Sequence, residues 1–204
     1  GGVSYGAYTT AFNTQVLAAG GSLTPSELSA LTLFETSMGA DMAEFDRLWI
    51  HGLSNQIAAR TSFVNPTSTP LTEVNSPTWT AYQGYTGNGS TTYLNTNYNP
   101  ATNGVKFTQN NAEFGIYSYT DVSEFAYDIG GIDIGTNYQL LLNTRNLSNL
   151  IVCSINSFYA PLYGITTTSK GLTSLSRTSS TVVNVYKNGS FNADVSQLSQ
   201  GSPN

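Results

Sequence analysis

The sequence predicts a mainly β protein, an antiparallel β-sandwich or jelly roll preceded by a short helical segment. Beyond Phe63, the Gly, Pro and Asn pairs that are typical of turns recur about every ten residues. The segments between them are short and rich in β-branched and aromatic residues. Before Phe63, apolar residues recur at helical spacing instead. We therefore expect a helical segment over residues 1–62 and a β-sandwich over residues 63–204.

The first expected helix covers about residues 7–19. Tyr8, Phe12 and Val16 are spaced four residues apart, which places them on one face of a helix. Gly20 follows and supplies the usual C-terminal stop.

A second helix is predicted by several start signals that coincide. Thr24 is placed to cap it, Pro25 occupies the first helical position, and Glu27 completes a capping box. Leu23 and Leu28 stand where a hydrophobic staple would lie. After this helix we expect a short helical turn near residues 41–45 and then an extended segment.

The helical segment carries an apolar stripe that needs a partner surface. We expect it to dock the protein in an assembly, or alternatively to bury against the β domain. The candidate anchors are Leu28, Leu31, Phe34, Leu48 and Trp49.

In the β part, the expected strands are short segments with alternating or apolar side chains. They are GVKFTQ (104–109), EFGIYSYT (113–120), YQLLLNT (138–144), LIVCSI (150–155), YGITTT (163–168) and TVVNVYK (181–187). Asn188 and Gly189 supply the positive φ angles of a type I′ turn, so residues 181–195 should form a hairpin.

The composition excludes several partners. Lys and Arg together number 7, and the net charge is −5, so a dense basic patch for a nucleic acid is not expected. No apolar run approaches the roughly 20 residues that cross a bilayer. Cys153 lies in an apolar segment and is expected in the core, and His51 is expected in a structural or surface position.

Three ordered motifs resemble a known family. They are GYTGNGSTTYLNTNYNP (Gly84–Pro100), YSYT (Tyr117–Thr120) and GLTSLSRTSSTVVNVYKNGS (Gly171–Ser190). Together they resemble the concanavalin A-like (laminin-G-like) jelly-roll virion proteins of tailed bacteriophages, particularly those of Bacteroidetes-type hosts. The resemblance covers roughly Phe12 to Lys187.

This resemblance implies a non-enzymatic structural protein on the particle surface, such as a capsid decoration, head-fibre or tail component. Its partners would be other virion proteins and copies of itself. Such proteins continue beyond the hairpin, whereas this sequence stops at GSPN. We therefore expect a sandwich that is incomplete at its C-terminus or completed by a neighbouring subunit, with its exposed edge covered.

An acidic cluster raises the question of catalysis or metal binding. Glycosidases of the concanavalin A-like fold carry Glu-x-Asp-x-x-Glu on one strand, an order that this chain lacks. Asp121 and Glu124 are three residues apart, which places them on opposite faces of a strand. With Asp128 they form a solvated loop, a site for a hard cation such as Ca²⁺ or, as a third alternative, the acids of an unusual glycosidase. No other cofactor is expected.

The alternative function is a carbohydrate- or receptor-binding adhesin, with a host surface glycan as partner. Tyr85 and Tyr93 flank a Gly-Asn-Gly loop, and their rings could stack on sugars. Asn88 could bind sugar hydroxyls. A place in the core or at a subunit contact remains open for each tyrosine.

Overall fold

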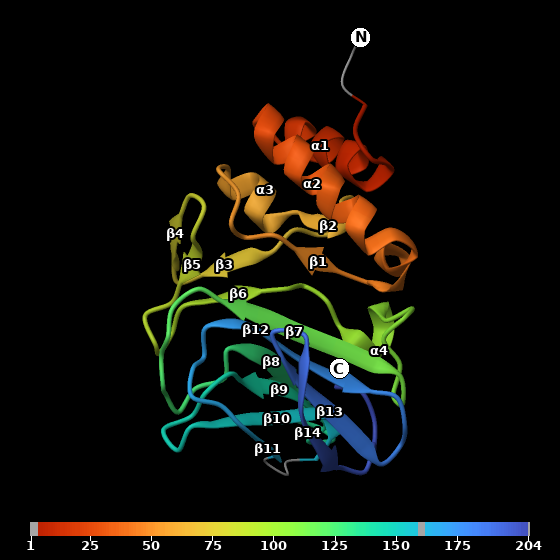
Figure 1. Cartoon of the computed structure of the whole chain (residues 1–204), viewed down its shortest axis with the longest axis vertical. Helices are drawn as coiled ribbons and strands as arrows, with labels where there is room; N and C mark the ends of the chain where they lie inside the picture. Colours follow the sequence, from red (N-terminus) through yellow and green to blue (C-terminus); the bar gives the residue numbers. More distant parts are fainter. Residues whose placement is uncertain (1–3, 159–161, 204) are drawn as a thin grey trace. The chain divides into compact units, whose positions relative to one another are not determined.

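The computed structural model describes residues 4–158 and 162–203. The chain folds into two compact units, Gly1–Tyr98 and Asn99–Asn204. The predicted class is confirmed at its coarse level, because the N-terminal helices are followed by antiparallel sheets (Figure 1). The sequence placed the end of the helical segment at residue 62, whereas the first unit extends to Tyr98.

Both predicted N-terminal helices are present. Helix α1 spans Ala7–Ala18 and helix α2 spans Pro25–Met38. The capping box is confirmed, since the hydroxyl of Thr24 accepts a hydrogen bond from the N–H of Glu27 and the Glu27 carboxylate accepts one from the N–H of Thr24. Glu27 is buried and also accepts hydrogen bonds from the N–H and hydroxyl of Ser54. This carboxylate therefore ties the start of α2 to the loop before α3.

The remaining elements of the first unit are short. They are the 3₁₀ helix η1 (Gly39–Glu44), β1 (Leu48–Trp49), α3 (Gln56–Arg60), β2 (Ser62–Val64), β3 (Thr72–Val74), β4 (Thr78–Thr80), β5 (Gly84–Thr86) and β6 (Tyr93–Asn95). Strand β1 pairs with β2, β3 with β6, and β4 with β5, all antiparallel. Residues 65–80, which are rich in Pro, Thr and Ser, contribute β3 and β4.

A hydrophobic core of its own holds the first unit together. Phe12 and Phe63 are fully buried, and their rings meet edge to face with centroids 5.3 Å apart. Val16, Leu31 and Met42 are buried in the same cluster. Phe63 is the residue at which the sequence placed the start of the β domain, so its burial here explains why the first unit extends past that point.

The five candidate assembly anchors lie in different environments. Leu28 and Leu31 are buried within the first unit, so neither is available to a partner. Phe34 is 37% exposed and packs on Phe63 with ring centroids 6.1 Å apart. Leu48 and Trp49 are half-buried. Leu31 and Phe34 of the stripe on α2 thus pack against elements of the first unit.

The second unit contains a short helix, α4 (Pro100–Asn103), and two four-stranded antiparallel sheets. One sheet has the order β11 (Leu162–Ile165), β10 (Leu150–Ser157), β9 (Gln139–Asn143) and β8 (Ile129–Ile132). The other has the order β14 (Ser190–Ser196), β13 (Val182–Lys187), β12 (Gly171–Arg177) and β7 (Ala112–Ser118).

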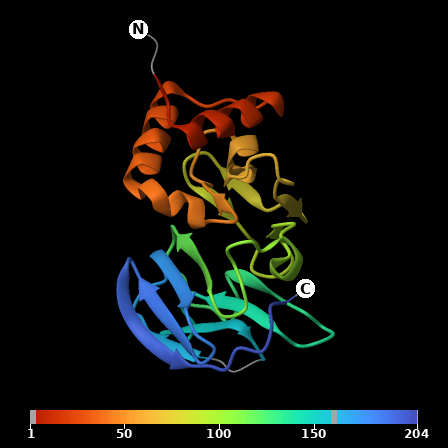
Figure 2. The ribbon, with the colours of Figure 1, turned by 90° about the vertical axis from the view of Figure 1, so that its right-hand side faces the viewer.

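The two sheets form a sandwich, visible as two layers in Figure 2. Leu142 and Ile151 from one sheet and Leu175 and Val183 from the other are fully buried in one cluster. This shared core is the packing that two antiparallel layers require. Cys153 is buried in the same cluster, as expected from the sequence.

The strand order differs from that of a jelly roll. A jelly roll consists of two Greek keys, so non-successive strands lie side by side in its sheets. Among the described strands, the sheet of β8 to β11 joins successive strands, and the other sheet has one non-successive pair, β7 with β12. The predicted layers are present; β8 to β11 form one meander, and in the other sheet β7 lies beside the meander of β12 to β14. The segment after β14 remains bonded to the sandwich. The N–H of Gln197 donates to the carbonyl of Thr181, and the N–H of Gln200 donates to the carbonyl of Asn156.

The predicted hairpin at residues 181–195 is confirmed. Asn188 and Gly189 have φ angles of 51° and 77°, as a type I′ turn requires. Val183 and Val185 are fully buried, whereas Asn184 and Tyr186 lie on the opposite face and are half-buried. The strand predicted at 104–109 is wrong, because these residues form bends and coil.

Hydrogen bonds from the start of α1 to Glu35 of α2 make the first unit sensitive to acid. The carboxylate of Glu35 accepts hydrogen bonds from the N–H groups of Tyr8 and Thr9 at 3.1 and 3.0 Å, at the start of α1. Burial by itself raises the pKa of Glu35, but the hydrogen bonds from Thr9 and Tyr8 outweigh it, and the pKa is lowered. The folded chain therefore binds this proton less tightly than the unfolded chain does.

The contribution of Glu35 to stability should thus be complete above its unfolded pKa and disappear as the pH falls through its folded pKa. We expect the melting temperature of the first unit to fall between about pH 5 and pH 3, and to fall less steeply in Glu35→Gln. Thermal unfolding followed by circular dichroism across this range measures both slopes. Equal slopes in the two proteins would contradict this role of Glu35.

Candidate functional sites

Tyr85, a predicted sugar contact, is part of a polar cluster in the first unit. Its hydroxyl donates to the carboxylate of Glu73 at 2.8 Å, and the same carboxylate oxygen accepts from the side chain of Gln56 at 2.7 Å. Arg60 lies 3.6 Å from that oxygen. Burial and the contact with Glu73 raise the pKa of Tyr85. Tyr85 is half-buried, and its hydroxyl links β5 to β3 through the carboxylate of Glu73.

The ring of His51 packs edge to face against Tyr85, with centroids 5.6 Å apart. Its Nδ1 lies 2.9 Å from the carbonyl oxygen of Ala59, and burial lowers the pKa of the imidazole. A neutral ring that donates from Nδ1 satisfies this contact. No local sequence signal indicates this cluster, because His51, Glu73 and Tyr85 lie far apart in the sequence and meet only in the folded unit.

Asn88 organises its own loop. Its side-chain oxygen accepts hydrogen bonds from the N–H groups of Ser90, Thr91 and Thr92, at 2.9 to 3.1 Å. Its side-chain nitrogen donates to the hydroxyl of Thr91. The amide that was predicted to bind sugar hydroxyls is thus engaged within the turn between β5 and β6. Of the two tyrosines predicted to contact sugars, Tyr93 is the more exposed, at 55%.

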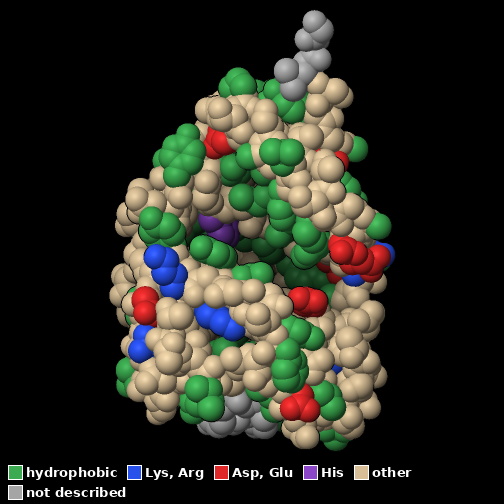
Figure 3. Space-filling view, in the orientation of Figure 1, with side chains coloured by type: hydrophobic (Ala, Val, Ile, Leu, Met, Phe, Trp, Pro, Cys, Tyr) green, Lys and Arg blue, Asp and Glu red, His purple; other side chains and the backbone are tan. Residues whose placement is uncertain are grey.

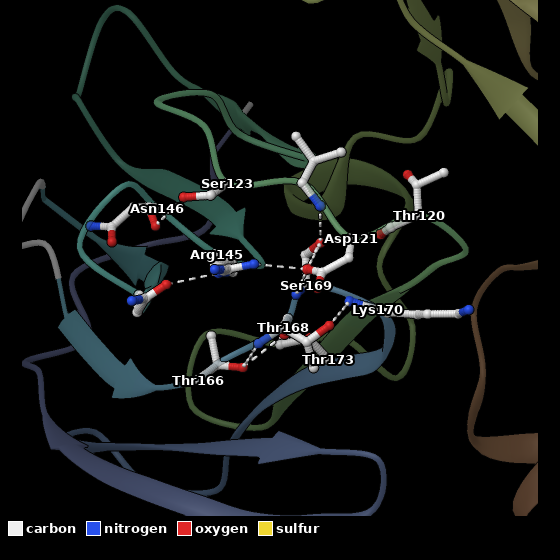
Figure 4. Close-up of polar contacts among 12 residues, drawn as sticks. Thr120, Asp121, Ser123, Arg145, Asn146, Thr166, Thr168, Ser169, Lys170 and Thr173 are labelled. Atoms are coloured by element: carbon white, nitrogen blue, oxygen red, sulfur yellow. Dashed lines mark hydrogen bonds and ion pairs between the residues drawn. The ribbon is translucent and has the colours of Figure 1, made fainter.

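The predicted acidic site in the second unit is dominated by a hydrogen-bond network around Asp121 (Figure 4). One oxygen of Asp121 accepts from the N–H of Ser169 and from Nη1 of Arg145, both at 2.9 Å. The N–H of Ser169 is the main cause that lowers the pKa of Asp121, and Arg145 contributes further. The network joins the loops that follow β7, β9 and β11. Its geometry holds these loops together.

The other two residues of the acidic cluster point to different partners. Asp128 accepts a hydrogen bond from the N–H of Thr144 at 2.6 Å. Glu124 takes part through its backbone, whose carbonyl accepts from the side chain of Asn143 and whose N–H donates to Arg145. Within residues 4–158 and 162–203, no three His, Cys, Asp or Glu side chains gather as a metal site. The Ca²⁺ site that the sequence allowed therefore finds no ligand set in this part of the chain.

Lys187 lies close to the same network. Its Nζ donates to the carbonyl of Ser169 and to the hydroxyl of Thr173, both at 2.9 Å. Burial lowers its pKa, while the charges of Asp121 and Asp128 oppose this effect. Lys187 on β13 thus holds the loop that precedes β12.

Large apolar side chains are exposed on the second unit. Phe125 and Ile134 are each 88% exposed, and Val105, Leu147 and Ile165 are also exposed. On the face shown in Figure 3, charged side chains are few and scattered. Hydrophobic side chains lie among tan backbone and polar side chains on that face. Single exposed apolar side chains are common on protein surfaces, whereas a contiguous group of them favours binding of another molecule. The sequence did not single out these residues, because exposure depends on which strand edges and loops the fold leaves open.

No family model, no curated protein and no solved structure matches this chain. Among the described residues, no helix has the length and hydrophobicity needed to cross a bilayer.

Proposed function

We propose that this chain is a non-enzymatic structural protein of a bacteriophage particle. In this role, the helical first unit docks onto the virion and the β-sandwich is presented at its surface. The observation that carries the proposal is the set of large apolar side chains that the second unit exposes. A protein that works in an assembly has partner surfaces to cover such side chains.

The polar groups that could suggest catalysis support the same conclusion. The hydroxyl of Tyr85, the carboxylate of Asp121 and the amide of Asn88 all take part in hydrogen bonds that fix neighbouring loops and strands. A general acid or base needs a position from which it reaches a substrate. These side chains are instead occupied in holding the fold.

The concanavalin A-like assignment is part of the proposal at the level of layers. It is supported by the three sequence motifs and by two antiparallel sheets around one core. The strand order described above departs from a jelly roll, so the relationship is proposed for the sandwich architecture and not for its winding.

The direct experiment is to look for the protein in the particle. Mass spectrometry of purified virions of the phage that encodes this chain should detect its peptides. Antibodies raised against the purified chain should label intact particles in electron micrographs. Particles that are free of both the peptides and the label would contradict the proposal.

We also expect the purified chain to self-associate through the exposed apolar side chains. Light scattering should give a mass that rises with concentration above the 21.8 kDa of one chain. The double variant Phe125→Ser, Ile134→Ser should remain closer to the mass of one chain. Tyr93→Ser is the matched control and should behave as the wild type. A mass of one chain at every concentration, or equal association in all three proteins, would contradict self-association at this surface.

A further inference from the structure

The outer face of the sheet formed by β14, β13, β12 and β7 has a pattern of its own. Thr173, Leu175 and Arg177 point into the sandwich and are fully buried. Successive side chains alternate between the faces of a strand, so Ser174 and Ser176 lie on the opposite, outer face. The two serines are half-buried and occupy the central strand of this face.

A floor of small residues crosses two strands. Gly115 on β7 pairs with Ser174 on β12, and Ser174 pairs in turn with Tyr186 on β13. A Cβ atom at Gly115 would lie 2.7 Å from the carbonyl oxygen of Thr173 and 2.8 Å from Cβ of Ser174. A side chain at this position is therefore excluded. The close approach of the β12 backbone thus requires glycine here, and the outer face is left without a side chain at this position.

Aromatic and apolar side chains stand on two sides of this floor. Tyr117 lies directly opposite Leu172 and is 65% exposed. In the same row as Gly115 and Ser174, Tyr186 and Phe191 pair across β13 and β14, with ring centroids 6.0 Å apart and planes at 78°.

A β-bulge explains why Phe191 joins this face. The register between β13 and β14 shifts so that Val185 pairs with Ala193 and Tyr186 pairs with Phe191, which leaves Asn192 as the extra residue. Ala193 packs against the sandwich core, and without the bulge Phe191 would follow it inward. The bulge instead turns Phe191 outward, where it is 60% exposed. Bulges often re-aim a side chain in this way.

The polar groups of the face suit a neutral ligand. Glu113, Ser176, Asn184 and Asp194 occupy one row across the four strands, with neighbouring strands about 4.8 Å apart. All residues of these four strands are described, and their outer-facing side chains include no Lys or Arg. Lys170, which precedes β12, lies over the ring of Tyr119 beyond the end of the strands. The strands themselves contribute two carboxylates and no cation to the face, which disfavours a polyanion. It offers hydroxyl, amide and carboxylate groups beside aromatic rings, which is the set that binds both the hydroxyls and the C–H faces of sugars.

We propose that this outer sheet face binds a neutral oligosaccharide, which lies over Gly115 and Ser174 and is bordered by Tyr117 along β7 and by Tyr186 with Phe191 across the strands. The site is distinct from the loop of Tyr85, Asn88 and Tyr93. The inference does not rest on the virion role, because it depends on the register and exposure of this sheet alone.

Affinity electrophoresis of the full chain tests the proposal. The chain is run through native gels that each contain one neutral polysaccharide, namely dextran, mannan, xyloglucan or a soluble mixed-linkage β-glucan. An alginate gel serves as the anionic comparison. At least one neutral polysaccharide should retard the wild type, and alginate should not. Tyr117→Ala and Phe191→Ala should each weaken the retarding interaction by about tenfold.

Tyr93→Ala is the matched control, because it removes an equally open tyrosine from the other candidate site. It should retain wild-type retardation. Melting temperatures should match in all the variants, since each replaced ring is largely exposed. The proposal is wrong if no neutral polysaccharide retards the wild type or if only alginate does. It is also wrong if Tyr117→Ala and Phe191→Ala are each retarded as strongly as the wild type. Loss of retardation in Tyr93→Ala alone would also overturn it, in favour of the loop.

Discussion

Replacing Arg177 with methionine should lower the free energy of unfolding of the second unit by about 3–5 kcal/mol. Arg177 is fully buried. Its Nε and Nη2 donate to the carbonyl of Ile155 at 3.1 and 2.9 Å, and its Nη1 donates to the carbonyl of Gln197 at 2.8 Å. It thereby connects β12 to β10 in the other sheet and to the residue that follows β14. Methionine fills much of the volume but leaves these carbonyl groups without donors.

Denaturant unfolding followed by circular dichroism measures this effect. Arg145→Met is the comparison and should cost less, because its partner Asp121 is 45% exposed and still accepts a hydrogen bond from the N–H of Ser169 when Arg145 is removed. Arg177→Lys should recover part of the lost stability, since one ammonium group can satisfy some of the carbonyls. If Arg177→Met loses no more stability than Arg145→Met, the buried arginine does not hold the two sheets together.

Replacing Phe63 with alanine should lower the stability of the first unit by about 3–5 kcal/mol. The Phe63 side chain is fully buried between the rings of Phe12 and Phe34. Its removal leaves a cavity that the surrounding helices cannot close fully. The same unfolding experiment measures the loss.

Leu33→Ala is the control for this prediction. Leu33 lies on the same helix as Phe34 and is 68% exposed, so its replacement should change stability by less than about 0.5 kcal/mol. A Phe63→Ala protein as stable as the Leu33→Ala protein would show that the aromatic contacts do not form the core of this unit.

The sequence predicted elements whose signals are local. The start of α2 follows from Thr24, Pro25 and Glu27, which lie within four residues of one another, and the hairpin turn follows from Asn188 and Gly189. Helix α3 was missed, although Asn55 caps it through two backbone N–H groups. That signal was present, but the helix covers only five residues.

Elements that depend on distant partners could not be predicted in this way. Residues 104–109 alternate like a strand, yet Phe107 is buried in the sandwich core while Val105 is exposed. Strand β8 was not predicted, because its two central glycines carry no strand signal.

The candidate sites show the same limit. Tyr85, Asn88 and Tyr93 are close in sequence, but each has a different role in the fold. The role of Arg177 and the outer sheet face both depend on strand register. Register is set by pairing between segments that lie far apart in the chain.

Two units with separate cores suit a protein that has a docking part and a presented part, and the proposed role depends on this division. Calorimetry of the full chain with Phe63→Ala and Arg177→Met is the decisive test of it. We expect two transitions, of which Phe63→Ala lowers only one and Arg177→Met only the other. A single transition that both substitutions shift by similar amounts would show that the chain has no such division.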